Sequence, residues 1–202
     1  MKSGTKPVAV GRPRAFNPDT ALEAAMQVFW QKGFEGASLD DLTKAMGMNR
    51  PSIYSAFGDK EALFRKALDR YAEGPASFVH HALEEKTARG AAEKIMRGTV
   101  DMVTCPKNPN GCLMVQGALA SGVASAAVCR DLLSRRELGV TLMRQRFKRA
   151  KAEGDLPKHV DPSALARYVA TVVHGISVEA TAGASRKELH KVVEMAMKAW
   201  PE

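Results

Sequence analysis

The sequence predicts an all-α protein with two helical regions. Helix-forming residues such as Ala, Leu, Met, Lys, Arg and Glu dominate, and aromatic residues make up only 6% of the 202 residues. Signals for helix starts recur along the chain, and glycines and prolines separate the helical segments. No stretch has the alternating pattern of a convincing β-strand. These three observations together predict a fold built from helices alone.

Capping signals define the first two predicted helices. The segment Asn17–Asp19 combines an N-cap asparagine, a proline in the first turn and an acidic residue. Gly33 is expected to end the helix that follows. The segment Ser38–Asp41 resembles a capping box, and we expect it to open a short helix over 39–46 that ends at Gly47.

The next two helices follow with very short connections. Asn49 is expected to cap a helix over 50–57, and Gly58-Asp59 to end it and cap a fourth helix over 60–71. The pair 39–46 and 50–57 is joined by a small turn that contains glycine. Two short helices with such a turn predict a helix-turn-helix.

Beyond Gly74-Pro75 the sequence predicts a larger helical region. Its expected helices are 76–88, 91–104, 112–123, 126–153, 162–181 and 186–200. We therefore expect three parts, namely an N-terminal arm over 1–16, a helix-turn-helix domain over 17–72 and a larger helical domain over 73–202.

The charge distribution is compatible with a polyanionic partner. The net charge is +8, and the arm before Phe16 has four basic residues and no acidic one: Lys2, Lys6, Arg12 and Arg14. Such an arm is typical of a polyanion contact or of a solubilising tail, and composition leaves both open.

Cysteine usage and hydropathy predict a cytoplasmic protein. Three cysteines without a C-x-x-C pattern indicate reduced thiols, and the N-terminus has no apolar signal segment. The stretch between Lys107 and Arg130 lacks charge but contains Asn, Pro, Gln and Ser. We therefore expect a buried helix there and no membrane contact.

The second helix of the pair is the candidate recognition helix. Ile53, Ala56 and Phe57 share one arc and are expected to face the core. The candidate DNA-contacting side chains lie on and beside the opposite arc: Arg50, Pro51, Ser52, Tyr54 and Ser55. Arginine can bond a guanine edge or a phosphate, and hydroxyl groups can bond phosphates. Ser38 and Lys60 begin the flanking helices, where free N–H groups favour a phosphate.

A set of residues with a specific order and spacing runs through this region. Its members are Gly11–Arg14, Ala25, Phe29, Gly33–Gly36, Ser38, Asp41-Leu42, Ala45, Gly47-Met48, Ile53-Tyr54, Phe57 and Lys60–Phe64. The set resembles the DNA-binding domain of TetR/AcrR-type transcriptional repressors over about residues 11–65. The resemblance implies an all-α homodimer whose N-terminal domain binds double-stranded operator DNA. It also implies a C-terminal domain that binds a small-molecule effector, and release from DNA when that effector binds.

The resemblance also assigns positions. Arg12 and Arg14 match the basic arm that lies along the DNA backbone or minor groove. The positions that commonly touch DNA in the family are matched by Ser38, Arg50, Pro51, Ser52, Tyr54, Ser55 and Lys60. Two residues depart from the family pattern. Asn49 replaces a common serine cap and caps equally well, whereas Ser55 is smaller than usual and leaves its base preference open.

Apolar positions of the larger region suggest an effector pocket and a dimer face. We expect the pocket among Phe78, Met96, Val100, Val103, Cys112, Val115, Leu119, Phe147 and His174. We expect the dimer face on the last two helices, through Val169, Val172, Val173, Ile176, Val193, Ala196 and Met197. The same stripes could instead close the core of a single chain.

Catalytic motifs are absent from the sequence. It has no Gly-rich phosphate loop, no H-E-x-x-H and no G-x-S-x-G. His80 and His81 are adjacent, so on a helix they point about 100° apart and do not suit one metal ion. We therefore expect no enzyme activity, no cofactor and no metal.

Alternative functions stay open at this point, and one of them, within the same class, is an activator or a nucleoid-type binder that has no effector. The segment Asn110–Val115 resembles a subgroup of these repressors in part of which the matching cysteine, here Cys112, senses electrophiles or oxidants. A helix start there would favour the reactive thiolate, whereas burial would leave the thiol inert. A third alternative is a non-regulatory small-molecule stress-binding protein whose basic surface is incidental.

Overall fold

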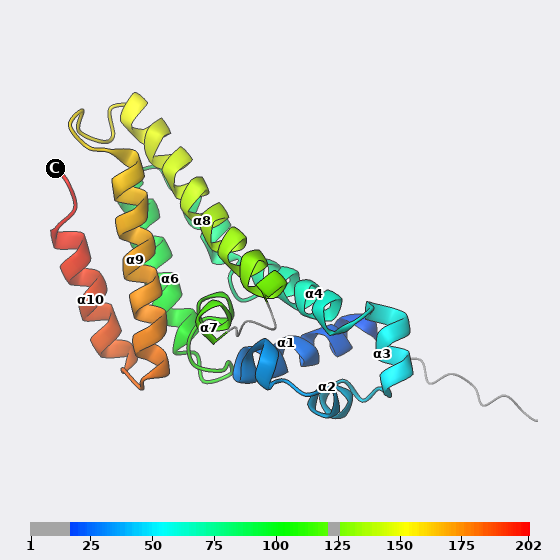
Figure 1. Cartoon of the computed structure of the whole chain (residues 1–202). Coiled ribbons are helices and arrows are strands. Elements are labelled where there is room, and N and C mark those ends of the chain that lie inside the picture. Colours follow the sequence, from blue (N-terminus) through cyan, green and yellow to red (C-terminus); the bar gives the residue numbers. More distant parts are fainter. Residues whose placement is uncertain (1–16, 121–125) are drawn as a thin grey trace, which may run out of the picture.

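The structure is a computed structural model that describes residues 17–120 and 126–202, without the side chains of 118–120. The regular structure of these ranges consists of ten helices and no strand, which confirms the predicted fold class (Figure 1). Arg12 and Arg14, two of the predicted DNA contacts, lie outside the described residues.

Four helices form the N-terminal part. They are α1 (Pro18–Gly36), α2 (Leu39–Met46), α3 (Arg50–Phe57) and α4 (Lys60–Glu73). Their caps follow the sequence signals: the side chains of Asn17, Asn49 and Asp59 each accept a backbone N–H, and Ser38 and Asp41 form a complete capping box. Each helix start is therefore determined by local sequence.

Gly33 produces a kink within α1 instead of ending it. Its φ of 69° and ψ of 178° are open to glycine but strained for other residues, and helical backbone continues to Gly36. The kink lets Phe34 reach the core, where its ring lies 5.2 Å from that of Phe64. Phe29 lies 4.9 Å from the same ring in an edge-on geometry. This aromatic cluster joins α1 to α4.

Six helices form the C-terminal part. They are α5 (Phe78–Leu83), α6 (Ala88–Val103), α7 (Leu113–Ala120), α8 (Ala126–Ala152), α9 (Pro162–Thr181) and α10 (Arg186–Lys198). The predicted helix 76–88 is reduced to α5, because Thr87 already caps α6 by accepting the N–H of Gly90 at 3.0 Å. α8 packs on α9, and α6 packs on α9 and α10 (Figure 1).

The two parts are joined through α1 and α4. α1 packs on α7, and α4 also contacts α7. Figure 1 shows α4 running from α3 at one end of the molecule toward α7 and α8. No helix of the described ranges is both long enough and apolar enough to cross a bilayer.

Candidate DNA-binding face and internal cavity

The exposed face of α3 carries the predicted contact residues. Ile53 and Phe57 are buried in the core, which anchors the helix. Ala56, expected to join them, is exposed, because the buried arc of α3 is narrower than predicted. The opposite side presents side chains that are exposed, or half-buried in the case of Ser52: Arg50, Pro51, Ser52, Tyr54 and Ser55. α3 therefore offers a free polar surface that fits a DNA groove.

The turn between α2 and α3 is set by local backbone bonds. Gly47 adopts the left-handed conformation, with φ 64°, at the end of α2. The N–H of Met48 then donates to the carbonyl of Thr43 at 3.2 Å. Asn49 caps α3 by accepting the N–H of Ser52 at 2.9 Å. The angle between the helices is thus determined by residues 43–52, and the predicted helix-turn-helix is present.

Arg50 is oriented by an acid on the neighbouring helix. Its guanidinium donates to the Asp40 carboxylate with an N–O distance of 2.8 Å, and this contact raises the pKa of Arg50. The Arg50 side chain stays 54% exposed. The ion pair therefore restricts the guanidinium without covering it.

Ser38 and Lys60 begin helices that flank α3, but each has a partner within the chain. The Ser38 hydroxyl accepts the N–H of Asp41 at 3.0 Å and donates to its carboxylate at 2.7 Å. Bonds from Lys32 and Ser38 hold the pKa of Asp41 well below its usual range. The Lys60 ammonium lies 4.5 Å from the centre of the Phe34 ring, and burial lowers its pKa.

A cavity of about 240 Å³ lies within the C-terminal part, and Tyr71 of α4 forms part of its wall. Of the predicted pocket residues, Phe78, Cys112, Val115 and His174 line it. Four other predicted pocket residues are buried in the core and do not line this cavity: Met96, Val100, Val103 and Phe147. The side chain of Leu119 lies outside the described residues.

Polar residues of the cavity wall include several that the sequence analysis did not single out. The Tyr71 hydroxyl donates to the sulfur of Cys112 at 3.3 Å and to that of Met102 at 3.2 Å. Burial raises the pKa of Tyr71 well above its usual value. Arg136 contacts Nδ1 of His174 at 3.0 Å, and burial lowers the pKa of His174 to about 4. The available signal for Tyr71 was its place on the apolar face of α4, since a buried tyrosine hydroxyl needs a partner.

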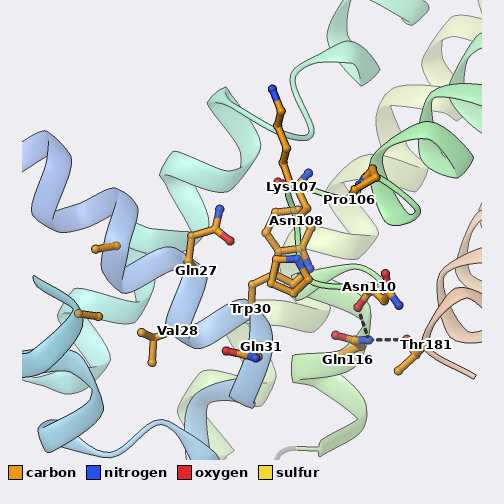
Figure 2. A pocket seen from close by; sticks show the side chains of 13 residues that line it. Gln27, Val28, Trp30, Gln31, Pro106, Lys107, Asn108, Asn110, Gln116 and Thr181 are labelled. Carbon is orange, nitrogen blue, oxygen red and sulfur yellow. Dashed lines mark hydrogen bonds between the residues drawn. The ribbon is translucent and has the colours of Figure 1, made fainter. Parts of the chain in front are cut away.

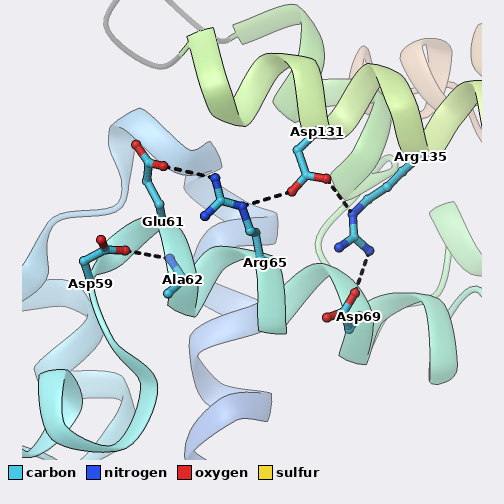
Figure 3. Close-up of polar contacts among 7 residues, drawn as sticks. All are labelled: Asp59, Glu61, Ala62, Arg65, Asp69, Asp131 and Arg135. Carbon is cyan, nitrogen blue, oxygen red and sulfur yellow. Dashed lines mark hydrogen bonds and ion pairs between the residues drawn. The ribbon is translucent and has the colours of Figure 1, made fainter.

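Ion pairs connect the cavity wall to α4. Arg135 lines the cavity and bonds Asp69 of α4 at 2.7 Å. Arg65 of α4 bonds Asp131 of α8 at 3.4 Å, and Asp131 also contacts Arg135 at 3.4 Å. Figure 3 shows these four side chains in one row between the two helices. We refer to Arg65, Asp69, Asp131 and Arg135 as the α4–α8 cluster.

A second, wider pocket of about 660 Å³ lies between α1 and the loop before α7. The indole N–H of Trp30 donates to the carbonyl of Gly111 at 3.0 Å beside this pocket. Figure 2 shows Gln116 bonded to both Asn110 and Thr181. This pocket was not predicted, because residues far apart in the sequence form it.

The apolar stripes predicted as a dimer face point inward. The buried members of the set are Val169, Ile176, Val193, Ala196 and Met197, while Val172 and Val173 are half-buried and pack against the core. Val173 also lines the cavity. Five of these seven side chains therefore pack in the core of the chain itself, and a dimer face on the last two helices stays a prediction. The opposite faces of α9 and α10 expose other apolar side chains: Tyr168, Val178, Val192 and Met195.

No group of three or more metal-ligating side chains was found among the described residues. Cys105, Cys112 and Cys129 are all free and half-buried. The structure thus offers two features for function, an exposed polar recognition helix and a mainly apolar cavity, with α4 in contact with both regions.

Two family models match the chain. Residues 21–67 match bacterial regulatory proteins of the tetR family, and residues 91–196 match the tetracyclin repressor-like C-terminal domain. The two matches cover the helix-turn-helix and most of the helices that surround the cavity.

Curated relatives align along nearly the whole chain. The HTH-type transcriptional repressor ComR of Escherichia coli (strain K12) is 34% identical over 195 residues, which cover 95% of this chain and 92% of ComR. The HTH-type transcriptional repressor BdcR of the same organism is 27% identical over 189 residues, covering 92% and 90%.

A solved structure of the regulator CifR agrees closely with the fold. It is a cysteine mutant complexed with 26-bp double-strand operator DNA, and it is 44% identical with a TM-score of 0.90. The alignment covers 94% of this chain and 100% of that one. A putative TetR regulator from Rhodococcus sp. RHA1 is 43% identical, with a TM-score of 0.62, and covers 90% of this chain and 98% of that one.

Proposed function

This chain belongs to the TetR family of DNA-binding transcriptional repressors, and we propose that it acts as a homodimer that a small molecule releases from its operator. Membership of this family sets aside the alternative of a non-regulatory stress-binding protein. α3 supplies the base contacts, and Arg12 and Arg14 add backbone or minor-groove contacts. The dimer works in the cytoplasm, where its operator DNA lies.

The observation that carries the release mechanism is the position of α4. The helix begins three residues after the end of α3, and its Tyr71 forms part of the cavity wall. Fourteen helical residues span about 21 Å as a nearly rigid rod. A ligand that displaces Tyr71 therefore changes the position of α3 as well.

The α4–α8 cluster supplies a second connection between cavity and DNA-binding helices. Arg135 forms part of the cavity wall and at the same time holds Asp69 of α4. A ligand that draws Arg135 away weakens this link, so α4 favours a different position relative to α8. In this proposal, ligand binding shifts the population between two arrangements, only one of which matches the operator.

The homodimer forms through the outer faces of α9 and α10. These faces expose four large apolar side chains: Tyr168, Val178, Val192 and Met195. Contiguous exposed apolar side chains often mark a protein–protein contact. A twofold axis at this face places the two copies of α3 in two half-sites of the operator, with about 34–36 Å or slightly more between the half-site centres.

Operator selection tests the repressor function directly. The full chain is incubated with short genomic fragments, bound fragments are sequenced, and affinity for the selected pseudo-palindrome is compared with a scrambled version at 150 mM salt. We expect preference for the selected site by about a thousand-fold or more. Equal affinity for both would contradict the proposal, because charge alone gives binding that ignores sequence.

A second candidate mechanism is covalent sensing through Cys112. Its sulfur lines the cavity and contacts the Tyr71 hydroxyl, so an adduct there changes the same contact as a reversible ligand would. In an addition to an activated double bond, the thiolate sulfur bonds one carbon and a proton from water goes to the other. The similar regulator CifR has been solved as cysteine mutants on operator DNA.

A further inference from the structure

The cavity wall has an unbalanced charge. Its ionisable side chains include Arg135, Arg136, His80 and His174, while no aspartate or glutamate is among its described lining residues. Most of the remaining wall is apolar. A positive group in such surroundings is costly unless a counter-charge is close.

Arg135 has its counter-charges outside the cavity. It bonds Asp69 at 2.7 Å and Asp131 at 3.4 Å. Arg136 differs, because its hydrogen bond is to Nδ1 of His174 at 3.0 Å and no described carboxylate pairs with it. The Nε of Arg136 is buried and has no hydrogen-bond partner among the described atoms. The pKa of His174 is lowered to about 4, so at neutral pH this partner carries no charge.

The hydroxyl groups around the cavity are mostly satisfied by the chain. Thr99 donates to the carbonyl of Ile95 and Ser177 to that of Val173, both at 2.8 Å. Among the described residues, the single hydroxyl proton of Tyr71 is shared between the sulfurs of Cys112 and Met102, which are weak acceptors. A ligand oxygen would therefore add the most favourable new hydrogen bonds at Arg136 and Tyr71.

We propose that the effector is an apolar molecule with a single carboxylate, and that this carboxylate pairs with Arg136. One carboxylate balances one guanidinium and can accept two N–H bonds from its planar fork. The volume of about 240 Å³ sets the size, since a dry cavity of about 150 Å³ holds benzene. A one-ring aromatic acid or a medium-chain fatty acid meets both conditions. The inference rests on the proposed function, whose effector site is this cavity.

Matched acid and amide pairs test the charge requirement. Benzoate and benzamide, and octanoate and octanamide, are titrated into the full chain by isothermal calorimetry at pH 7. The members of each pair have nearly the same shape, so their affinity ratio reports the charge. We expect at least one acid to bind about ten-fold or more tightly than its amide. Equal affinity of acid and amide in both pairs, or no measurable binding by either acid, would overturn the inference.

Variants of Arg136 locate the carboxylate. Arg136→Gln should reduce the acid-to-amide ratio to about one, and Arg136→Lys should retain part of it. Arg149→Gln removes an exposed guanidinium of the same helix, away from the cavity, and should leave the ratio unchanged. Circular dichroism checks that each variant is folded. An acid preference that survives in Arg136→Gln would contradict the assignment. If that variant does not fold, Arg136→Lys replaces it in the test: a partial acid preference supports the assignment, and either an unchanged preference or none contradicts it.

Operator release is measured separately, by fluorescence anisotropy of labelled DNA. Acid binding without release would contradict the proposed release mechanism but support the carboxylate site. Release by neutral compounds only, with no acid preference, would support the release mechanism and overturn the carboxylate site.

Discussion

Arg50 at the start of the recognition helix is held by Asp40 of the preceding helix, with 2.8 Å between guanidinium nitrogen and carboxylate oxygen. The ion pair connects α2 to α3 across the turn of the helix-turn-helix and keeps the Arg50 guanidinium on the exposed side of α3. A guanidinium that is oriented before binding loses less side-chain entropy when it bonds a base edge. This relationship leads to the first prediction.

Arg50→Ala should lower affinity for the selected operator about ten- to one-hundred-fold and relax its sequence preference, because a bidentate base contact is lost. Asp40→Ala should reduce the ratio of specific to non-specific affinity, since it removes the acceptor that orients the guanidinium. Anisotropy titrations on selected and scrambled DNA measure both effects.

Lys60→Ala is the matched contrast to Arg50→Ala. An ammonium that contacts a phosphate contributes equally to every sequence, so the variant should weaken both DNAs alike and reduce the salt slope by about 1. If Arg50→Ala also lowered both affinities equally, Arg50 would be a phosphate contact and not a base contact.

Local signals in the sequence were sufficient for the N-terminal part. The caps at Asn17, Ser38 and Asn49 and the turn at Gly47 are determined by residues within five positions of each other, so sequence alone identifies them. The kink at Gly33 shows the limit, because a glycine that breaks the local bond pattern can either end a helix or bend it.

The cavity and the outer faces depend on helix crossing, which sequence alone does not determine. Phe147 and Met96 have the same apolar character as the wall residues Phe78 and Met102, and only the packing of α6, α8 and α9 separates the two sets. Arg136 stands beside Arg135 in the sequence, yet the two guanidinium groups have different partners. Val169 is buried in the core of the chain. Helical periodicity identifies the apolar stripe to which Val169 belongs, but it does not show whether the same chain or a second chain covers that stripe.

Met195→Glu should separate the dimer into monomers, because it places a charge on the proposed contact of α10. Met195 is 64% exposed, so the change should leave the fold of one chain intact. Light scattering at micromolar concentration measures the oligomeric state. Leu133→Glu is the control, since it replaces an apolar side chain of α8 that is 50% exposed and lies outside the proposed face. A wild-type protein that is already monomeric would exclude the dimer and its paired half-sites.

Acidification should destabilise the protein through His174. The pKa of His174 is about 4 in the folded chain, against about 6.5 when unfolded, because of burial and the charges of Arg136 and Arg167. Between these two pKa values His174 is therefore protonated in the unfolded state but not in the folded state. The contribution of neutral His174 to the free energy of unfolding is complete above about pH 6.5 and is lost as the pH falls toward 4.

Comparison of the wild type with His174→Gln isolates this effect, since glutamine can still accept from Arg136 but does not titrate. The imidazole is only partly buried, so solvent screening reduces the effect to about 1 kcal/mol, or about 2–4 °C in Tm. Thermal unfolding of both proteins at pH 7 and pH 5 gives the measurement. We expect the wild type to lose more stability than the variant. An equal loss in both would show that His174 titrates normally.

Alkylation of Cys112 decides between reversible and covalent sensing. Cys112 lies directly before α7, is half-buried, and its sulfur accepts a bond from Tyr71, so a bulky adduct would displace the tyrosine that connects α4 to the cavity. N-ethylmaleimide should then lower operator affinity of the wild type about ten-fold or more, and leave Cys112→Ser unaffected. Peptide mass spectrometry locates the adduct, and Cys129→Ser controls for reaction at another half-buried thiol. If Cys112 is not alkylated, or is alkylated while DNA binding stays unchanged, covalent sensing is wrong. The effector would then be a reversible ligand of the cavity that Cys112 lines.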